Sequence, residues 1–239
     1  MLRLDVLNRL FDTYLKDRAF RFLEIGPGLG DVGRYLETFE NCTAGVLVDF
    51  SEQSSEHLKK RFAGSAGVSV QYGDIMQLEE LSDFDVMLAF EVLEHVENDE
   101  QMLAGIAQKL VPGGLFFMSV PAYQKKWQRQ DEYAGHLRRY ERAELNSKLR
   151  NAGFELLEIV DYGFPLTSLM RPVRWFAYRN RPSEDAVELT KRSGVDRPFF
   201  STKSTQLARL FYWPFQKIQW LFRKGELGDG LIVVARKAR

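Results

Sequence analysis

The sequence has little cysteine, no excess of positive or negative charge, and no long apolar run. Its 239 residues include a single cysteine, Cys42, so no disulfide can form within the chain, which is typical of a reducing compartment. Lys and Arg number 33, as do Asp and Glu, and this balance argues against a polyanion binder. No run of about twenty apolar residues is present, so no membrane span is expected. Charges interrupt every apolar stretch of the N-terminus, so we expect a cytoplasmic protein without a signal peptide.

Short apolar runs alternate with helical patterns along most of the chain. Apolar runs suited to buried strands occupy 20–25, 44–50, 68–74, 84–91, 115–121, 154–164 and 230–237. Helical spacing is found at 32–39, 53–62, 98–110 and 141–152. Strands that alternate with helices predict an α/β fold with a parallel, doubly wound sheet. An amphipathic helix within 1–19 is expected to cover this domain.

The segment 163–228 interrupts the alternation before the last predicted strand. It contains twelve Lys and Arg against five Asp and Glu, and many aromatic residues such as Trp175 and Trp213. We interpret it as a helical insertion, with 181–198 as a polar loop and Pro214 as a kink or break in the last helix. Its composition fits a lid over an apolar acceptor, a contact with the inner, anionic surface of a membrane, or a single-stranded RNA surface. It also fits packing against the sheet or another subunit.

A glycine-rich turn, GPGLG, follows the first predicted strand and precedes a predicted helix. Gly26, Gly28 and Gly30 allow the backbone to turn tightly and to approach a ligand at the helix N-terminus. Nineteen residues after Gly30, Asp49 ends the second predicted strand, where a carboxylate accepts hydrogen bonds from ribose hydroxyls. Both a nicotinamide dinucleotide and S-adenosylmethionine fit this pattern.

Three further residues fit an adenine beside that ribose. Asp74, at the end of the third predicted strand, is placed to accept a hydrogen bond from the adenine amino group, and Ile75 to contact the ring. Phe50, directly after Asp49, is placed to stack on the other face of the adenine. Each residue also has a structural role open to it, since Asp74 can cap a turn and Phe50 can belong to the core. Their order along the chain favours ligand binding.

These stretches together resemble a known family. LEIGPGLG, Asp49, GDI, FDVMLAFEVLEHVEND and LVPGGLFFMSVP resemble class I S-adenosylmethionine-dependent methyltransferases over 20–162 and the last strand. The resemblance implies a Rossmann-like α/β fold of seven strands in the order 3-2-1-4-5-7-6, with the last strand antiparallel. It also implies one methyltransferase domain over 1–239, with S-adenosylmethionine as cofactor. A dehydrogenase would require hydride-handling residues that the sequence does not show.

The resemblance also implies which residues contact the cofactor. The methionine part is expected to lie against Glu24, Gly26, Gly28 and Gly30. The ribose is expected at Asp49. The adenosine is expected among Asp74, Ile75 and Phe90.

The stretch FEVLEHV, which ends the fourth predicted strand, carries the candidate catalytic chemistry. Glu91, Glu94 and His95 have the spacing i, i+3 and i+4, so on a helical turn they would share one face. In one interpretation His95 is a general base that takes a proton from an acceptor hydroxyl. In the other, all three residues bind a divalent metal such as Mg²⁺, which acidifies that hydroxyl.

His136 follows the fifth predicted strand, at the expected mouth of the site, as a second catalytic candidate and a fourth metal ligand. Glu-x-x-Glu-His with a later histidine resembles the metal-binding set of small-RNA 2′-O-methyltransferases, and its core also resembles ubiquinone-pathway O-methyltransferases. The surrounding AGHLRRY lacks the aromatic-rich context of the RNA enzymes. Arg138, Arg139 and Tyr140 either contact the acceptor or stabilise the fold, for example through Asp131.

The sequence therefore predicts methyl transfer to an oxygen acceptor. GHLRRY resembles methyltransferases of bacterial glycan and natural-product pathways, which points to a small-molecule, glycan or lipid-linked acceptor. An RNA-end 2′-O-methyltransferase is the alternative acceptor class, and the zero net charge argues against it. A non-catalytic methyltransferase-like partner subunit is the alternative outside enzymes, and the intact glycines and Asp49 argue against it.

Overall fold

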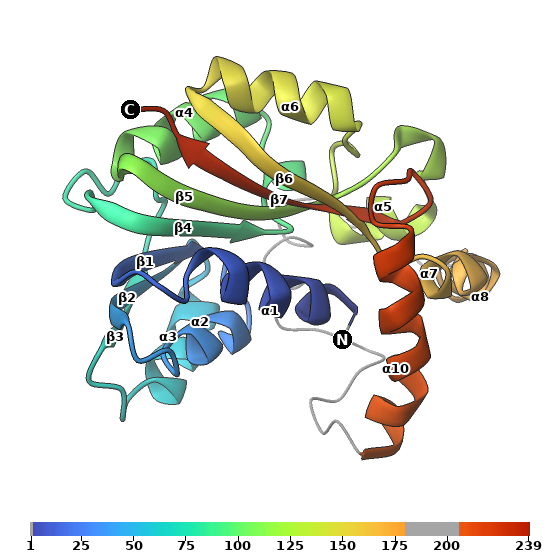
Figure 1. The fold of residues 1–239 in the computed structure, drawn as a ribbon, viewed down its shortest axis with the longest axis horizontal. Helices are drawn as coiled ribbons and strands as arrows, with labels where there is room; N and C mark the ends of the chain where they lie inside the picture. Colours follow the sequence, from blue (N-terminus) through green and yellow to red (C-terminus); the bar gives the residue numbers. More distant parts are fainter. Residues whose placement is uncertain (1, 180–205) are drawn as a thin grey trace.

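A single mixed sheet organises the chain, of which the computed structural model describes residues 2–179 and 206–239. Its strands are β1 (Phe20–Ile25), β2 (Cys42–Asp49), β3 (Val68–Tyr72), β4 (Phe84–Phe90), β5 (Leu110–Pro121), β6 (Phe154–Tyr162) and β7 (Gly230–Lys237). They lie in the order β3-β2-β1-β4-β5-β7-β6 (Figure 1). The first five strands in this order pair in parallel, and β7 is antiparallel to both β5 and β6. This confirms the strand order and the antiparallel last strand implied by the sequence.

Helices cover both faces of the sheet. The described helices are α1 (Leu2–Tyr14), α2 (Asp31–Leu36), α3 (Glu52–Arg61), α4 (Asp99–Lys109), α5 (Arg129–Ala134), α6 (Arg142–Asn151), α7 (Leu166–Leu169), α8 (Arg171–Tyr178) and α10 (Gln206–Leu221), with short 3₁₀ helices η1 (Leu93–His95) and η2 (Gln124–Lys126). As Figure 1 shows, α1, α2 and α3 lie on one face, and α4 and α6 on the other.

The side chains of β4 alternate between two hydrophobic cores, because successive residues of a strand point to opposite faces. Met87 and Ala89 belong to the core beneath α4 and α6. Val86 and Leu88 belong to the core beneath α1, α2 and α3. Both faces of the strand are therefore buried, which is why it appears in the sequence as a continuous apolar run.

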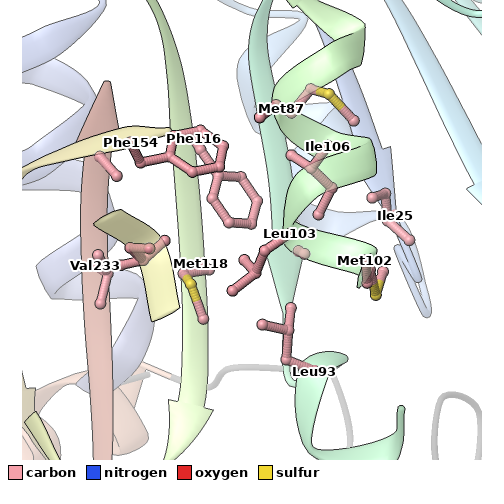
Figure 2. Close-up of a cluster of buried hydrophobic side chains, with 14 of the residues drawn as sticks. Ile25, Met87, Leu93, Met102, Leu103, Ile106, Phe116, Met118, Phe154 and Val233 are labelled. Carbon is pink, nitrogen blue, oxygen red and sulfur yellow. The ribbon is translucent and has the colours of Figure 1, made fainter. Parts of the chain in front are cut away.

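The core beneath α4 also fixes the chain that follows β4. Figure 2 shows Leu103 and Ile106 of α4 facing Phe116 and Met118 of β5. Leu93 of η1 is fully buried in the same core. This packing anchors η1, which carries the candidate catalytic residues, at the carboxyl end of β4.

β5 begins earlier than the sequence indicated. The strand was predicted over 115–121, whereas β5 starts at Leu110 and includes Pro112, Gly113 and Gly114, residues typical of turns. Gly113 has φ +76, and the pairing with β4 shifts register between Phe84 and Val86. The turn-forming residues thus produce a local irregularity of the strand in place of a loop.

The described part of 163–228 is helical, and α10 contacts α1 and β6. Gln219 is buried, with its Nε2 donating to the Leu2 carbonyl (3.1 Å) and its Oε1 accepting from the Gly163 N–H (3.2 Å). α10 runs continuously through Pro214, so the helix is not split there. These contacts tie the segment to the N-terminal helix.

The predicted loop 181–198 lies outside the described residues. Of the helices that the structure describes, none has the length and apolar character needed to cross a bilayer.

A close approach of β1 and β2 generates the first prediction. A Cβ at Gly45 would overlap the fully buried ring of Phe22. We predict that Gly45→Ala lowers the free energy of unfolding by about 1–3 kcal/mol, as overpacking of a core does. Urea denaturation followed by circular dichroism measures the change. Gly64→Ala is the matched control, since a Cβ there meets no described atom within 4 Å. An equal loss at both positions would contradict the prediction.

Candidate active site

The glycine loop after β1 has a backbone that other residues rarely adopt. Gly26, Gly28 and Gly30 have φ of +61, +55 and +75. The Gly26 N–H donates to the Val48 carbonyl at 2.9 Å, which ties the loop to the end of β2. The loop therefore needs glycine for its conformation, and it lies at the edge where parallel strands end.

A pocket of about 600 Å³ opens at this edge, a volume in the range of small-molecule sites. Glu91 and His95 contribute to its wall. Six of the predicted cofactor residues also line it, namely Gly26, Gly28, Asp49, Phe50, Asp74 and Ile75. The structure thus brings candidate cofactor-binding and catalytic side chains into one cavity.

The two aspartates in the wall also hold their own loops. Asp49 Oδ1 accepts the Ser51 N–H at 2.8 Å, and Asp74 Oδ1 accepts the Met76 N–H at 2.9 Å. Burial raises the pKa of Asp49, and the Ser51 N–H lowers it. Phe50 is 45% exposed, so its ring is available to a ligand. Asp74 therefore combines the turn-capping role with a place in the pocket wall.

Three predicted cofactor residues, Glu24, Gly30 and Phe90, do not belong to the described pocket wall. Burial raises the pKa of Glu24 to about 8, while the Gly33 N–H and the charge of Arg3 lower it. Gly30 precedes α2, where a Cβ would clash with side chains at the end of α3. Phe90 is buried in the core beneath α1. These residues shape the loop and strand behind the wall.

Sequence reasoning missed the wall contributed by the chain after Glu91. It includes Val92, Val96, Asn98, Gln101 and Met102. Asn98 caps α4, with its Oδ1 accepting the Gln101 N–H at 3.0 Å. An Asn at the start of a predicted helix, here 98–110, is a recognisable N-cap signal, which could have placed this helix start at the pocket.

The predicted helical face of Glu91, Glu94 and His95 does not form. Glu91 has φ +58, which is not helical, and η1 begins only at Leu93. The positive φ turns the chain between Glu91 and the other two residues. Glu91 therefore points away from the direction that the i, i+3, i+4 spacing indicated.

Glu91 is held by donors from three other elements. Its Oε1 accepts from Ser119 Oγ of β5 at 2.6 Å and from Tyr162 OH of β6 at 3.2 Å. Arg3 Nη1 of α1 lies 3.5 Å from the same oxygen. The carboxylate thus links the N-terminal helix to the sheet at the pocket.

Glu94 is fully buried, and in the described part of the chain neither of its carboxylate oxygens has a hydrogen-bond partner. Burial, with the charge of Glu91 as the next cause, raises the pKa of Glu94 well above its usual value. An isolated buried carboxylate is strongly unfavourable. The group is therefore suited to be protonated or to be paired with a cation.

The two histidines are oriented by acceptors on their Nδ1 atoms. His95 Nδ1 lies 3.1 Å from the Gly135 carbonyl, and His136 Nδ1 lies 2.9 Å from Asp131 Oδ1. Because these oxygens only accept, each neutral ring carries its proton on Nδ1 and its lone pair on Nε2. Ligand atoms of Glu94, His95 and His136 all lie within 4.8 Å of one another.

Glu94, His95 and His136 form a group that could hold a metal ion without Glu91. Burial, followed by the charge of His136, lowers the pKa of His95 to about 4. The imidazole is therefore neutral at pH 7, as a metal ligand must be. Three of the four predicted ligands, Glu94, His95 and His136, are brought together, and Glu91 is bonded elsewhere.

The remaining polar residues of GHLRRY are bonded within the fold. Arg139 Nε donates to Asp131 Oδ1 at 2.9 Å. Tyr140, fully buried, donates its hydroxyl to Asp99 Oδ2 at 2.8 Å, and Arg138 pairs with Asp99 at 3.4 Å. These contacts match the structural alternative for the three residues, since they support the loop that carries the site.

The strand order, the glycine loop and the acidic end of β2 define a Rossmann-like domain built to bind a nucleoside. The family described as "Methyltransferase domain" matches residues 3–159. The chain belongs to this family, in the class I S-adenosylmethionine-dependent methyltransferases.

The curated relatives are distant and match only in part. The chain is 26% identical over 170 residues to sterol 24-C-methyltransferase of Clavispora lusitaniae, covering 65% of this chain and 44% of that protein. It is 30% identical over 138 residues to a probable S-adenosylmethionine-dependent methyltransferase of Mycolicibacterium smegmatis, covering 56% and 51%. It is 32% identical over 125 residues to ubiquinone biosynthesis O-methyltransferase of Rickettsia canadensis, covering 51% of each. The chain thus spans about half the length of the curated relatives it matches.

Solved structures share the fold at low identity. A putative methyltransferase from Bacillus halodurans C-125 superposes with a TM-score of 0.64 at 19% identity, covering 98% of this chain and 99% of that one. The [4+2]-cyclase SpnF superposes with a TM-score of 0.64 at 18% identity, covering 98% and 80%. At such identities the likeness shows the fold alone.

The environment of His95 generates the second prediction. In protein freed of divalent cations, we predict that the His95 ring stays neutral from about pH 8 to about pH 5, since burial disfavours the imidazolium. Its midpoint is expected at about 4, below the ordinary 6.5. Proton–carbon NMR of the histidine rings measures this, with the exposed His57 of α3 as the internal reference.

His136→Gln is expected to move the His95 midpoint upward, because the charge of His136 opposes protonation of His95. His95 also affects stability, because its pKa is about 4 in the folded state and about 6.5 in the unfolded state. Between these pH values the folded state binds fewer protons than the unfolded state. The free energy of unfolding is therefore expected to fall as the pH is lowered from about 6.5 to about 4. A midpoint near 6.5 in the wild type would show that the ring is not desolvated.

Proposed function

We propose that this domain transfers a methyl group from S-adenosylmethionine to a hydroxyl oxygen of an acceptor. The observation that carries the proposal is that one pocket contains both Asp49, suited to a ribose, and His95, suited to handling a hydroxyl. When bound, S-adenosylmethionine supplies an electrophilic methyl group on a positively charged sulfur.

The pocket wall fits the parts of this cofactor. Asp49 uses Oδ1 for the Ser51 N–H, and a carboxylate accepts up to about four hydrogen bonds, so it retains capacity for a ribose diol. Asp74, Ile75 and the exposed ring of Phe50 would hold the adenine. The turn of Gly26 and Gly28 would lie against the methionine part. Family membership and the lining of the pocket support this arrangement.

The reaction needs alignment more than covalent catalysis. The bond between carbon and the acceptor oxygen forms as the carbon–sulfur bond breaks, and the sulfur keeps the electron pair. Holding the two reactants in line converts a bimolecular reaction into one within a complex. The acceptor oxygen must also lose its proton, and His95 Nε2 is the atom in the pocket wall suited to accept it.

The low pKa of His95 bears on how that proton is lost. A general base works best when its pKa lies near the operating pH, and a pKa of about 4 lies well below neutrality. A neutral imidazole suits a divalent cation better, as does the Glu94 carboxylate, which lies 3.9 Å from His136 Nε2 and accepts no hydrogen bond from the described residues. Glu94, His95 and His136 would hold the cation, which would lower the pKa of an acceptor hydroxyl. We therefore propose that a divalent cation assists removal of the proton. If no cation is bound, His95 is the base.

The acceptor is proposed from the chemistry of the cluster. The relatives are named for both a carbon and an oxygen methyltransferase. A hydroxyl acceptor requires removal of a proton, which a cluster of one glutamate and two histidines can assist. This supports a small-molecule, glycan or lipid-linked hydroxyl as the acceptor.

Asp49→Ala is the third prediction and tests the cofactor site. We expect S-adenosylmethionine binding to weaken by about 1–3 kcal/mol, because the ribose hydroxyls lose their charged acceptor. Isothermal titration calorimetry measures the change. Glu52→Ala, an exposed carboxylate three residues along the chain and outside the pocket wall, is the control and should bind as the wild type does. Equal affinity in Asp49→Ala and wild type would remove Asp49 from the cofactor site.

His95→Ala is the fourth prediction and tests the catalytic role. Cofactor affinity should be retained, whereas transfer of a radiolabelled methyl group to hydroxylated aromatic, glycan and polyprenyl acceptors should fall at least about tenfold. Unchanged transfer in the variant would remove His95 from the mechanism.

Chelation distinguishes the two roles of His95. If a cation assists, treatment of the wild type with EDTA should reduce transfer to the level of His95→Ala, and Mg²⁺ or Mn²⁺ should restore it. Full activity after chelation would leave His95 as the base. Glu94→Gln should reduce cation binding in calorimetry without changing cofactor affinity, since its carboxylate lies outside the pocket wall.

A further inference from the structure

α7 and α8 display apolar side chains to solvent. Val173 and Phe176 of α8 are spaced i and i+3, so they share one helical face, and they are 56% and 61% exposed. Leu169, the last residue of α7, is 65% exposed. Met170 and Trp175 flank them with 40% and 55% exposure. We call these five residues the α8 face. A monomeric protein rarely exposes such a contiguous apolar surface without a use for it.

The side of α8 opposite this face holds the helix to the domain. The Tyr178 ring lies 5.3 Å from the Tyr133 ring of α5, centroid to centroid. Arg174 donates to the Thr167 carbonyl at 2.8 Å and pairs with Asp229. A surface helix ordinarily buries its apolar side and exposes its charges. α8 does the reverse, so its apolar face is available to something outside the described structure.

The part of the chain that carries the α8 face is positively charged. Residues 163–179 contain three arginines, Arg171, Arg174 and Arg179, and no Asp or Glu. Arg171 and the exposed Arg179 lie at the two ends of α8, and the Arg179 guanidinium lies 3.8 Å from the centroid of the Phe176 ring. Such a surface is complementary to anionic headgroups above an apolar interior, whereas two copies of it would repel each other.

We propose that the α8 face docks on an anionic lipid bilayer. The side chains of Trp175 and Phe176 enter the boundary between headgroups and acyl chains, and Arg171 and Arg179 bind lipid phosphates. The helix lies in the plane of the interface, because it is too short to span a bilayer of about 30 Å.

The docking surface adjoins the candidate active site. α8 packs on α5, and Arg129 of α5 donates to the Arg179 carbonyl. Helix α5 also carries Asp131, whose Oδ1 lies 2.9 Å from Nδ1 of His136. A bilayer bound to α8 therefore lies one helix away from the cluster. The acceptor class that fits is an amphiphile with a hydroxyl near the headgroups, a conclusion that rests on the proposed methyl transfer.

Vesicle co-sedimentation of the full chain tests the docking. Wild type should sediment with vesicles of phosphatidylglycerol and phosphatidylcholine, less so as salt is raised, and not with phosphatidylcholine alone. The double variant Trp175→Ser/Phe176→Ser should lose at least about tenfold in partition coefficient. Tyr72→Ser is the matched control, because Tyr72 is 53% exposed on β3 at the opposite edge of the sheet and should not affect binding.

The charge contribution is tested separately. Arg171→Gln/Arg179→Gln should lower the partition coefficient for anionic vesicles at least about tenfold. Lys59→Gln/Lys60→Gln removes two exposed charges from α3 and should leave vesicle binding unchanged. Circular dichroism of each variant establishes that the fold is retained.

Three results would overturn the docking proposal. They are equal binding to neutral and anionic vesicles, wild-type binding by the Trp175/Phe176 variant, and a wild-type dimer in ultracentrifugation that this variant abolishes. The last would identify a second copy of the chain as the occupant. The assay contains no cofactor or acceptor, and His95→Ala should bind vesicles as the wild type does. Failure of the methyl-transfer proposal would therefore leave this result unchanged, and the reverse also holds.

Discussion

The turn at Glu91 is the constraint on which the candidate site depends. A residue other than glycine with a positive φ costs on the order of 1–3 kcal/mol, and such a conformation persists where surrounding contacts impose it. Here Ser119, Tyr162 and Arg3 impose it through the Glu91 carboxylate. Because the turn follows β4 directly, it determines where η1 begins and hence where His95 meets the pocket. Contacts from β5, β6 and α1 thus position Glu91, the residue that directly follows β4.

Desolvation accounts for the unusual electrostatics of the cluster beside that turn. It raises the pKa of Glu94 and lowers that of His95, so both groups favour their uncharged forms. Gly135 and Asp131 meanwhile fix the two imidazoles with their lone pairs on Nε2. A buried and oriented set of ligands, in which Glu94 and His95 favour their uncharged forms, is well suited to bind a divalent cation with release of protons. The same burial makes His95 a weak base.

Much of the fold could be predicted because both faces of the sheet are covered. Parallel strands buried on both sides appear as continuous apolar runs, and the bounds of β1 and β7 agree with the predicted 20–25 and 230–237. Asp49 and Asp74 could be placed in one pocket since parallel strands end at the same edge of a sheet. Strand β5 was less predictable, because Gly113, with its positive φ, lies within the strand before the predicted 115–121.

The sequence by itself determined the α/β alternation, the glycine loop and the edge of the sheet at which the pocket opens, because periodicity and turn chemistry are local properties. The tertiary structure alone decided the direction of Glu91, whose partners Ser119 and Tyr162 lie 28 and 71 residues away along the chain. It likewise decided that Glu94 is buried and that α8 turns its apolar face outward. These features depend on contacts between side chains that are far apart in the sequence. The spacing of residues along a single helix or strand does not predict such contacts.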